Sequence, residues 1–289
     1  MHLLAAGEQA TTATASADQA APAEPPPEAV GLVAGIALLV SGLAGMTLTR
    51  GPGRRLLERA GGDTPPPWSA ADVVTLILLH LACQVVAAGV LLPKPLPEGV
   101  VVWQQLAAGI AASLMTLAIA LPLMVVRSRD WRALQLTSRR PLGDVAAGLL
   151  MLLAITPPLL FLAGMLNRIV PYHHPILDFL ASEQGPWALT LTATSAVLVA
   201  PLAEEFFFRG VLQGWLERVK PELAIPVSAT AFGLAHVDHG LGWIPLVGFG
   251  IAAGVLTRQT GSLVASITLH AGFNAVGLLA AMSQSPAAR

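Results

Sequence analysis

Charged residues are scarce in this 289-residue chain: they make up 11% of it, against 54% hydrophobic residues. A soluble domain carries about a quarter charged residues, so this shortage excludes an ordinary soluble protein. The mean hydropathy of +0.68 and the long uncharged runs indicate helices that cross a lipid bilayer. The formal net charge of −1 argues against general nucleic-acid binding. We therefore expect an integral membrane protein whose partners include the bilayer and no nucleic acid.

Other absences narrow the fold further. The single cysteine, Cys83, excludes an internal disulfide, and its apolar neighbours predict a buried, hydrophobic role. Residues 1–29 lack a basic stretch followed by an apolar one, so no cleavable signal peptide is expected, and their Ala, Thr, Pro and Glu content predicts a disordered tail. No internal repeat is found, whereas transporters commonly contain two related halves.

The hydropathy pattern predicts an all-α, polytopic membrane protein with about eight transmembrane helices. The expected spans are 30–49, 73–92, 101–126, 145–166, 187–219, 222–237, 243–257 and 263–282. By this division the tail at 1–29 is followed by a three-helix unit with basic loops, 30–141, and by a helical core, 142–285.

Basic residues are concentrated in the loops after the first, third, fifth and seventh spans. They include Arg54, Arg132, Arg218 and Arg258. Because such loops stay in the cytoplasm, the pattern predicts a multi-pass protein of the cell membrane with both termini outside the cytoplasm. The six tryptophans, Trp68 among them, all lie near expected span ends, which is typical of residues at the membrane–water interface.

Two adjacent carboxylates occur within the fifth span. Ionisable groups at membrane depth are costly, and they mark either a functional site or a buried pair. On a helix, Glu205 and Arg209 are i,i+4 neighbours that can form an ion pair. Glu204 lies about 100° around the helix and has no such partner in its own segment. The spacing predicts that Glu205 and Arg209 stabilise the site and that Glu204 takes part in the reaction.

Two later spans carry further polar side chains. His236 lies near the end of the sixth span, while His270 and Asn274 share one face of the eighth because they are i,i+4 neighbours. Glu204 and His236 are equally distant in sequence from the turn at Lys220, so they share a depth if the fifth span is one continuous helix. We therefore expect these side chains to converge in one polar cavity.

Such a set has the groups needed to hydrolyse a peptide bond. Glu204 can take a proton from water, and His236 can orient that water. His270 and Asn274 can donate hydrogen bonds to the oxyanion of the tetrahedral intermediate. Phe232, one helical turn before His236, can pack against its imidazole and fix the rotamer.

Three motifs carry a family resemblance. They are Glu204-Glu205-x-x-x-Arg209, Phe232-x-x-x-His236 and His270-x-x-x-Asn274. In this order on successive hydrophobic helices, they resemble the motifs of the CAAX-protease and bacteriocin-processing family, the intramembrane endopeptidases related to the Rce1 prenyl-protein protease. The resemblance covers about 143–282.

This resemblance implies an eight-span helical bundle with a water-containing cavity. It implies peptide-bond hydrolysis by a carboxylate-activated water, with Glu204, His236, His270 and Asn274 at the site and support from Glu205 and Arg209. The implied substrate is a membrane-associated or lipidated protein or peptide, such as a prenylated C-terminal tail or a leader peptide.

Zinc is the alternative to metal-free chemistry. The H-E-x-x-H motif of zinc proteases is absent, yet Glu204, His236 and His270 could supply three ligands with water in the fourth position. Asn274 is a poor zinc ligand, and a metal-bound Glu204 could not act as the base. The residues therefore favour a mechanism without metal or other cofactor.

Two other functions stay open at this point. A transporter could use Glu204 and the histidines as a proton relay, and an immunity or scaffold protein could keep the fold without the chemistry. Outside the motifs, His80 and Gln84 share a face of the second span and predict hydrogen bonds between helices. Gly250 and Gly254 predict close helix contact in the seventh span.

Overall fold

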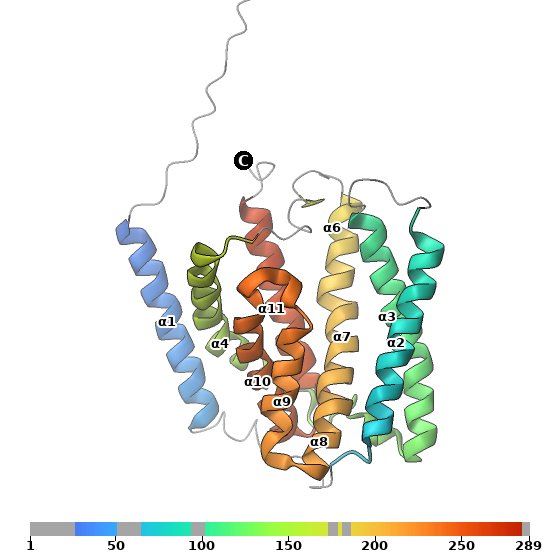
Figure 1. The fold of residues 1–289 in the computed structure, drawn as a ribbon. Helices are drawn as coiled ribbons and strands as arrows, with labels where there is room; N and C mark the ends of the chain where they lie inside the picture. Colours follow the sequence, from blue (N-terminus) through green and yellow to red (C-terminus); the bar gives the residue numbers. More distant parts are fainter. Residues whose placement is uncertain (1–26, 51–64, 94–101, 173–178, 181–185, 285–289) are drawn as a thin grey trace, which may run out of the picture.

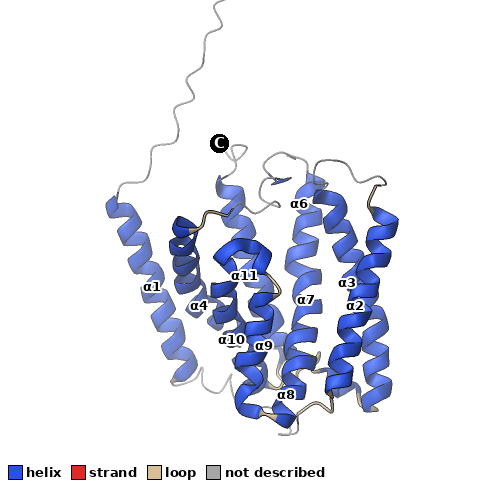
Figure 2. Cartoon of the chain, viewed as in Figure 1, coloured by secondary structure: helices blue, strands red, loops and turns tan. Residues whose placement is uncertain are grey.

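The computed structural model describes residues 27–50, 65–93, 102–172, 179–180 and 186–284, and every regular element within these ranges is a helix (Figures 1 and 2). The predicted all-α fold is confirmed. Residues 1–26, which hold most of the expected disordered tail, lie outside the described part of the chain.

The helices follow the predicted spans closely. The first four long ones are α1 (Pro27–Thr49), α2 (Ala70–Leu91), α3 (Val102–Ser128) and α4 (Pro141–Ile169), with a short 3-10 turn, η2 (Trp131–Leu134), after α3. One continuous helix is then built from α6 (Pro186–Ala193), η3 (Thr194–Val199), α7 (Ala200–Glu205), η4 (Phe206–Gln213) and α8 (Gly214–Val219). The last elements are α9 (Pro221–Leu234), η5 (Val237–Gly242), α10 (Trp243–Thr260) and α11 (Leu263–Gln284).

Six helices of the described chain are long and apolar enough to cross a membrane. A helix occupies each of the eight predicted spans, but α9 has only 14 residues, too few to span a bilayer core of about 30 Å. It ends at Leu234, before the predicted boundary at 237, because the backbone leaves the helical conformation at His236 (φ −116°, ψ 25°). His236 therefore lies just past a short helix rather than within a full span.

The fifth span is a single 34-residue helix from Pro186 to Val219, as the depth argument requires. Its segments η3 and η4 are π-helical and lie on either side of α7. In η3 the N–H of Ala200 bonds to the carbonyl of Ser195, five residues earlier. The next residue, Pro201, has no N–H, so the corresponding carbonyl, that of Ala196, receives no bond from it. The helix thus changes its pitch immediately before and after the two carboxylates.

The order of helices in space differs from the order in the chain (Figure 1). The α2–α3 hairpin packs on one side of the continuous helix, and α9 and α11 pack on its other side. Helix α4 packs against α10 and α11, and α1 packs against α4. The continuous helix, which carries both carboxylates, therefore lies between the N-terminal hairpin and the C-terminal helices.

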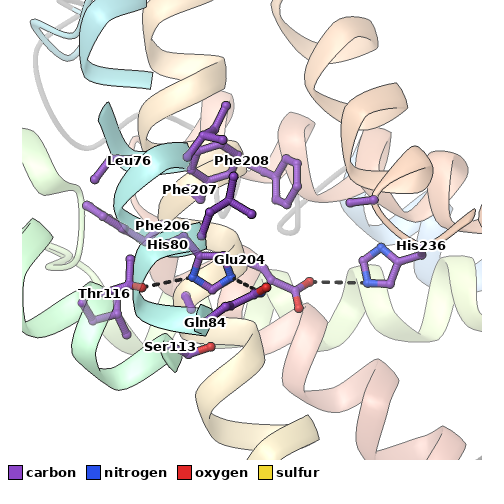
Figure 3. A pocket seen from close by; sticks show the side chains of 15 residues that line it. Leu76, His80, Gln84, Ser113, Thr116, Glu204, Phe206, Phe207, Phe208 and His236 are labelled. Carbon is purple, nitrogen blue, oxygen red and sulfur yellow. Dashed lines mark hydrogen bonds and ion pairs between the residues drawn. The ribbon is translucent and has the colours of Figure 1, made fainter. Parts of the chain in front are cut away.

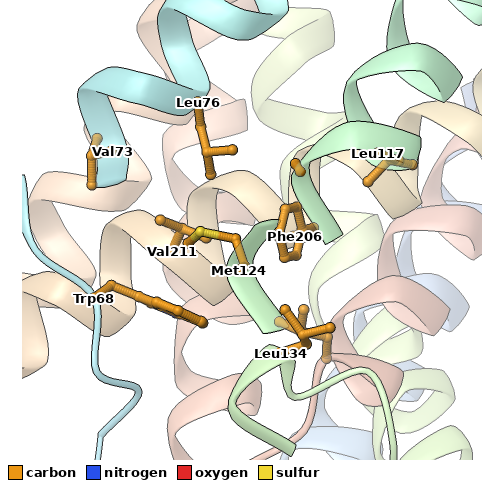
Figure 4. Close-up of a cluster of buried hydrophobic side chains, with 10 residues drawn as sticks. Trp68, Val73, Leu76, Leu117, Met124, Leu134, Phe206 and Val211 are labelled. Carbon is orange, nitrogen blue, oxygen red and sulfur yellow. The ribbon is translucent and has the colours of Figure 1, made fainter. Parts of the chain in front are cut away.

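A hydrophobic cluster joins the hairpin to the continuous helix (Figure 4). Leu76 of α2, Met124 of α3 and Phe206 of η4 are all buried in it. Trp68 belongs to the same cluster and is only 1% exposed; it lies just before the start of α2, near a span end as predicted, and packs against protein. The indole covers Gly214, where an added Cβ would lie 3.2 Å from its ring. This packing holds α2 and α3 as one wall of the site.

Small residues bring α9 and α10 together. A Cβ added at Gly250 would lie 2.8 Å from Ala229 Cα, and one at Gly254 would lie 2.7 Å from Gln213 Oε1. The predicted close contact at these glycines is confirmed, and it sets α10 against both α9 and the continuous helix. Cys83 is buried, as predicted, in a small apolar cluster between α2 and α3.

Polar contacts join several helix ends at one end of the bundle. Arg258, in the last turn of α10, bonds to Glu217 of α8 at 3.1 Å and to the carbonyl of Pro221 at the start of α9. Arg127, at the end of α3, lies 3.6 Å from Asp72 in the first turn of α2. These basic residues follow or end the third and seventh spans, so the two basic loops lie on one side, while the assignment of that side to the cytoplasm stays a prediction.

Candidate active site

A cavity of about 380 Å³ lies between α2, α3, the continuous helix and the end of α9. The polar side chains that line it are His80, Gln84, Ser113, Thr116, Glu204 and His236. Figure 3 shows the Glu204 carboxylate between the α2 side chains and His236. The remaining wall is apolar and comes mainly from α2 and η4. The cavity thus combines one acidic group with imidazole, carboxamide and hydroxyl groups.

Glu204 approaches two imidazoles with the same oxygen. Its Oε2 lies 3.8 Å from His236 Nε2 and 3.9 Å from His270 Nε2. This oxygen is buried and has no hydrogen-bond partner in the described protein, although the side chain as a whole is 29% exposed. Both distances are too long for a direct hydrogen bond but leave room for a bridging water. The structure therefore brings together three of the four predicted site residues.

Hydrogen bonding assigns the protons of His236. Its Nδ1 lies 2.8 Å from the carbonyl oxygen of Phe232, which can only accept, so Nδ1 carries the hydrogen. In the neutral ring, Nε2 is then an acceptor facing Glu204. The Phe232 ring packs against this imidazole with the centroids 4.9 Å apart, as predicted.

The Glu205 carboxylate is fully buried and lies beside two hydrogen-bond donors, Arg209 and His270. Its Oε1 accepts a 2.8 Å hydrogen bond from Arg209 Nη1, so the predicted i,i+4 ion pair is present. The same oxygen lies 2.9 Å from His270 Nδ1, a contact between two motifs that the sequence spacing did not reveal. Arg209 is also fully buried, and its guanidinium carbon lies 4.4 Å from the Phe232 ring centroid and 5.9 Å from that of Phe249. Aromatic faces thus stabilise the part of the cation that Glu205 does not contact.

The contact with Glu205 also determines what His270 can do. An ionised carboxylate only accepts hydrogen bonds, so Nδ1 of His270 is the donor. Nε2, which faces Glu204, carries a second hydrogen only in the doubly protonated ring. The Phe249 ring packs edge-on against the imidazole, with the centroids 5.0 Å apart. Phe249 lies in no motif, and an isolated aromatic residue in an apolar span gives no local signal of such a role.

Asn274 bonds to the backbone of the continuous helix. Its Nδ2 donates a 2.7 Å hydrogen bond to the carbonyl of Ala196, the carbonyl that Pro201 leaves without a backbone bond. Among the described side chains, neither Asn274 nor His270 lines the cavity itself. Asn274 therefore holds the π-helical turn immediately before Glu204.

Two groups outside the motifs also reach the site. His80 Nδ1 lies 3.0 Å from Thr116 Oγ1, which confirms the predicted hydrogen bond between helices, and His80 Nε2 lies 2.9 Å from Gln84 Nε2. His239 of η5, which stacks on Tyr172, packs edge-on against His236 with the ring centroids 5.4 Å apart. The sequence places these residues on helices or turns but does not show which of them face the cavity.

The side chains named for the alternative zinc site stand farther apart than zinc ligands do, and the choice between zinc and metal-free chemistry stays a prediction. A tetrahedral zinc ion holds its ligand atoms about 3.3 Å apart, closer than the 3.8 and 3.9 Å that separate Glu204 Oε2 from the two imidazole nitrogens. In the described ranges no group of three His, Cys, Asp or Glu side chains has the arrangement of a metal-binding cluster.

Comparison with known protein families matches residues 186–276 to the Rce1-like family, described as type II CAAX prenyl endopeptidase Rce1-like. The match covers about a third of the chain, and we call residues 186–276 the Rce1-like region. The Rce1-like region is shorter than the 143–282 expected from the motifs, and it contains all three of them. No curated protein and no solved structure matches the chain.

The Rce1-like region begins with the continuous helix and ends within α11. Together with the six apolar helices, the match indicates an integral membrane protein that is similar to CAAX-type proteases in this region. Helices α2 and α3, which supply one wall of the cavity, lie outside the matched region.

Proposed function

We propose that this protein is an intramembrane endopeptidase that hydrolyses a peptide bond by means of a water activated by Glu204. The observation that carries the proposal is the buried Glu204 Oε2, which faces His236 Nε2 and His270 Nε2 at 3.8 and 3.9 Å without a partner of its own. A water bound between Glu204 and His236 can donate one hydrogen to each, because both facing atoms are acceptors.

The chemical steps follow from this arrangement. Glu204 takes a proton from the water while the oxygen of that water attacks the carbonyl carbon of the substrate. The C–N bond of the tetrahedral intermediate then breaks, and Glu204 returns the proton to the leaving amine. His236, fixed by Phe232, keeps the water in line with the substrate carbonyl.

His270 is the residue that we assign to the oxyanion. Donation from Nε2 requires the imidazolium form, since Nδ1 already donates to Glu205. With His270 protonated, two carboxylates face two cations, Arg209 and His270, and the buried group carries no net charge. A buried cluster of charges without net charge avoids the high free-energy cost of an unpaired buried charge. The predicted oxyanion role of Asn274 stays a prediction, whereas its observed bond supports the turn that carries Glu204.

The substrate that we propose is a prenylated or otherwise membrane-associated peptide, cut without a metal ion at the cell membrane. Two features support this choice: the Rce1-like region and a cavity whose walls are mostly apolar. A leader peptide that inserts into the bilayer is the alternative substrate of the same class.

The deciding experiment uses the full chain in proteoliposomes. The probe is a quenched fluorogenic peptide that ends in an S-farnesylated cysteine and three apolar residues, with its unprenylated counterpart in parallel. We expect the parent protein to cleave the prenylated probe and Glu204→Gln to lower kcat at least about a hundredfold, as expected for loss of a general base. Activity should persist after exhaustive chelation.

The matched control is Glu222→Gln, which removes an exposed carboxylate from the first turn of α9 and should leave kcat unchanged. Equal cleavage by the parent and by Glu204→Gln would contradict the proposed base. Loss of activity on chelation, restored by zinc, would contradict the metal-free mechanism and leave the peptidase function standing. Cleavage of the unprenylated probe alone would favour the leader-peptide alternative.

A further inference from the structure

Gln84 is one of four polar residues of the cavity that neither the motifs nor the proposed chemistry uses. It lies on α2, outside the Rce1-like region, and it faces the cavity that contains Glu204 and His236 (Figure 3). Its side chain is exposed in the bundle. A carboxamide turned towards lipid would leave its polar atoms without partners at a considerable cost. In the cavity, by contrast, the carboxamide can form hydrogen bonds.

A chain of hydrogen bonds fixes the orientation of Gln84, and it starts at Thr116. Thr116 Oγ1 lies 2.7 Å from the carbonyl oxygen of Ala112. Two oxygens at this separation require a hydrogen between them, and only the hydroxyl has one to give. The hydroxyl oxygen of Thr116 therefore accepts from His80 Nδ1, 3.0 Å away.

The assignment continues through the imidazole. Because Nδ1 of His80 donates to Thr116, Nε2 of the neutral ring is an acceptor. Gln84 Nε2 lies 2.9 Å away and donates one N–H to this acceptor. Both nitrogens of His80 are thus occupied by protein groups, which makes His80 a spacer between Thr116 and Gln84 rather than a second base.

Gln84 retains one N–H donor and its Oε1 acceptor, and the described residues offer neither of them a partner. Together these two groups have the hydrogen-bonding capacity of a peptide amide. An extended peptide that enters an apolar cavity has unpaired N–H and C=O groups of its own, which are costly to bury unpaired. A side-chain carboxamide can pair with both, in the way that a strand edge pairs with an added strand.

We propose that Gln84, held in place by His80 and Thr116, is a substrate-binding residue that pairs with a backbone amide of the substrate next to the bond that is cut. The exposed apolar side chains of α2 beside it, Ile77 and Leu81, take the apolar side chains of the bound peptide. The proposal deepens the proposed peptidase function and depends on it. It assigns a specificity role to the helical hairpin that lies outside the family match.

The test is a cycle of protein and substrate changes on the farnesylated fluorogenic peptide. Gln84→Met keeps the length of the side chain and removes both polar groups. We expect it to raise KM about tenfold, the effect of one or two lost hydrogen bonds, with kcat close to that of the parent. N-methylation of the substrate amide that pairs with Gln84 should have the same effect on the parent protein and little further effect on Gln84→Met, because the two changes remove one interaction.

A second pair of variants tests the positioning of Gln84. Thr116→Val removes the hydroxyl that anchors His80 and should raise KM in the same direction, whereas Thr116→Ser should restore the parent value. Two matched controls lie away from the cavity: Gln105→Met on α3, where the glutamine is exposed, and Thr47→Val on α1, where the hydroxyl bonds only to its own helix. Both should behave as the parent protein does.

Binding in a catalytically silent background separates this proposal from the proposed function. The dissociation constant of the farnesylated peptide is measured by fluorescence anisotropy for Glu204→Gln alone and for Glu204→Gln with Gln84→Met. About tenfold weaker binding in the double variant supports the proposal even if the parent cleaves no probe. Equal binding, or full additivity of Gln84→Met and every N-methylated peptide, overturns the role of Gln84 and leaves Glu204 as the base.

Discussion

Glu204 and Glu205 are neighbours in the chain but have opposite surroundings. Glu205 is fully buried and is contacted by Arg209 and His270 through one oxygen, 2.8 and 2.9 Å away. Glu204 is 29% exposed and has a buried oxygen without a protein partner. Successive residues on a helix point about 100° apart, so one turns towards the packed helices and the other towards the cavity. The different roles that we propose for them follow from this rotation.

Asn274 is the residue whose structural and catalytic roles can be separated. Asn274→Ala should lower the free energy of unfolding by about 1–2 kcal/mol, because the Ala196 carbonyl loses its donor. Thermal unfolding in detergent measures this change, with Thr190→Ala as the control, since that hydroxyl bonds to the carbonyl of Pro186 at an exposed position. A lower kcat with an unchanged unfolding temperature would instead indicate that Asn274 donates to the oxyanion.

The continuous helix is the element that positions the site. Its π-helical segments precede and follow the two carboxylates, and such turns occur frequently at functional sites. Side chains from other helices satisfy carbonyls in both segments: Asn274 bonds to Ala196, and Ser228 bonds to Phe208 at 2.8 Å. The depth and direction of Glu204 thus depend on α9 and α11 as well as on its own helix.

The contact between α9 and α10 should tolerate no added side chain at Gly250. In Gly250→Val the Cβ alone would lie 2.8 Å from Ala229 Cα, so the two helices must move apart. We expect a loss of about 1–3 kcal/mol in the free energy of unfolding and a lower kcat, because α9 sets the position of His236. The control, Gly164→Ala on α4, meets nothing within 4 Å and should be neutral or slightly stabilising. Unfolding temperatures and kcat close to those of the parent would contradict the proposed tight contact.

The sidedness of the whole molecule can be measured by cysteine labelling. In a Cys83→Ala background, Val170→Cys follows α4, and Lys220→Cys follows α8 at the basic end. If the basic loops are cytoplasmic, a membrane-impermeant maleimide should label Val170→Cys in intact cells and Lys220→Cys only after permeabilisation. The reverse pattern would show that both termini lie in the cytoplasm.

Much of the fold and part of the site follow from local sequence patterns. Uncharged runs predicted the helices because length and hydropathy alone decide which segments can enter a bilayer. The i,i+4 spacing predicted the Glu205–Arg209 pair and the Phe232–His236 contact because helix geometry is regular. Both contacts are present in the structure.

Contacts between distant helices could not be predicted in the same way. The bond from Asn274 to Ala196 depends on a π-helical turn, and the burial of Trp68 depends on how α2 meets η4. The place of Gln84 in the cavity depends on which face of α2 turns towards the continuous helix. Hydropathy gives no information on such pairings, since lipid and protein interior are similarly apolar.

The arrangement of the helices has a consequence for biosynthesis. His270 lies on α11, and α4 packs against α10 and α11 as well as against α1, so part of the packing of α4 forms only after the last two helices have emerged from the ribosome. A nascent chain that ends before Leu263 holds Glu204 and His236 but lacks the imidazole beside them. The set of side chains to which we assign hydrolysis is therefore complete only at the end of translation, and on the proposed mechanism an unfinished chain lacks the group that stabilises the oxyanion.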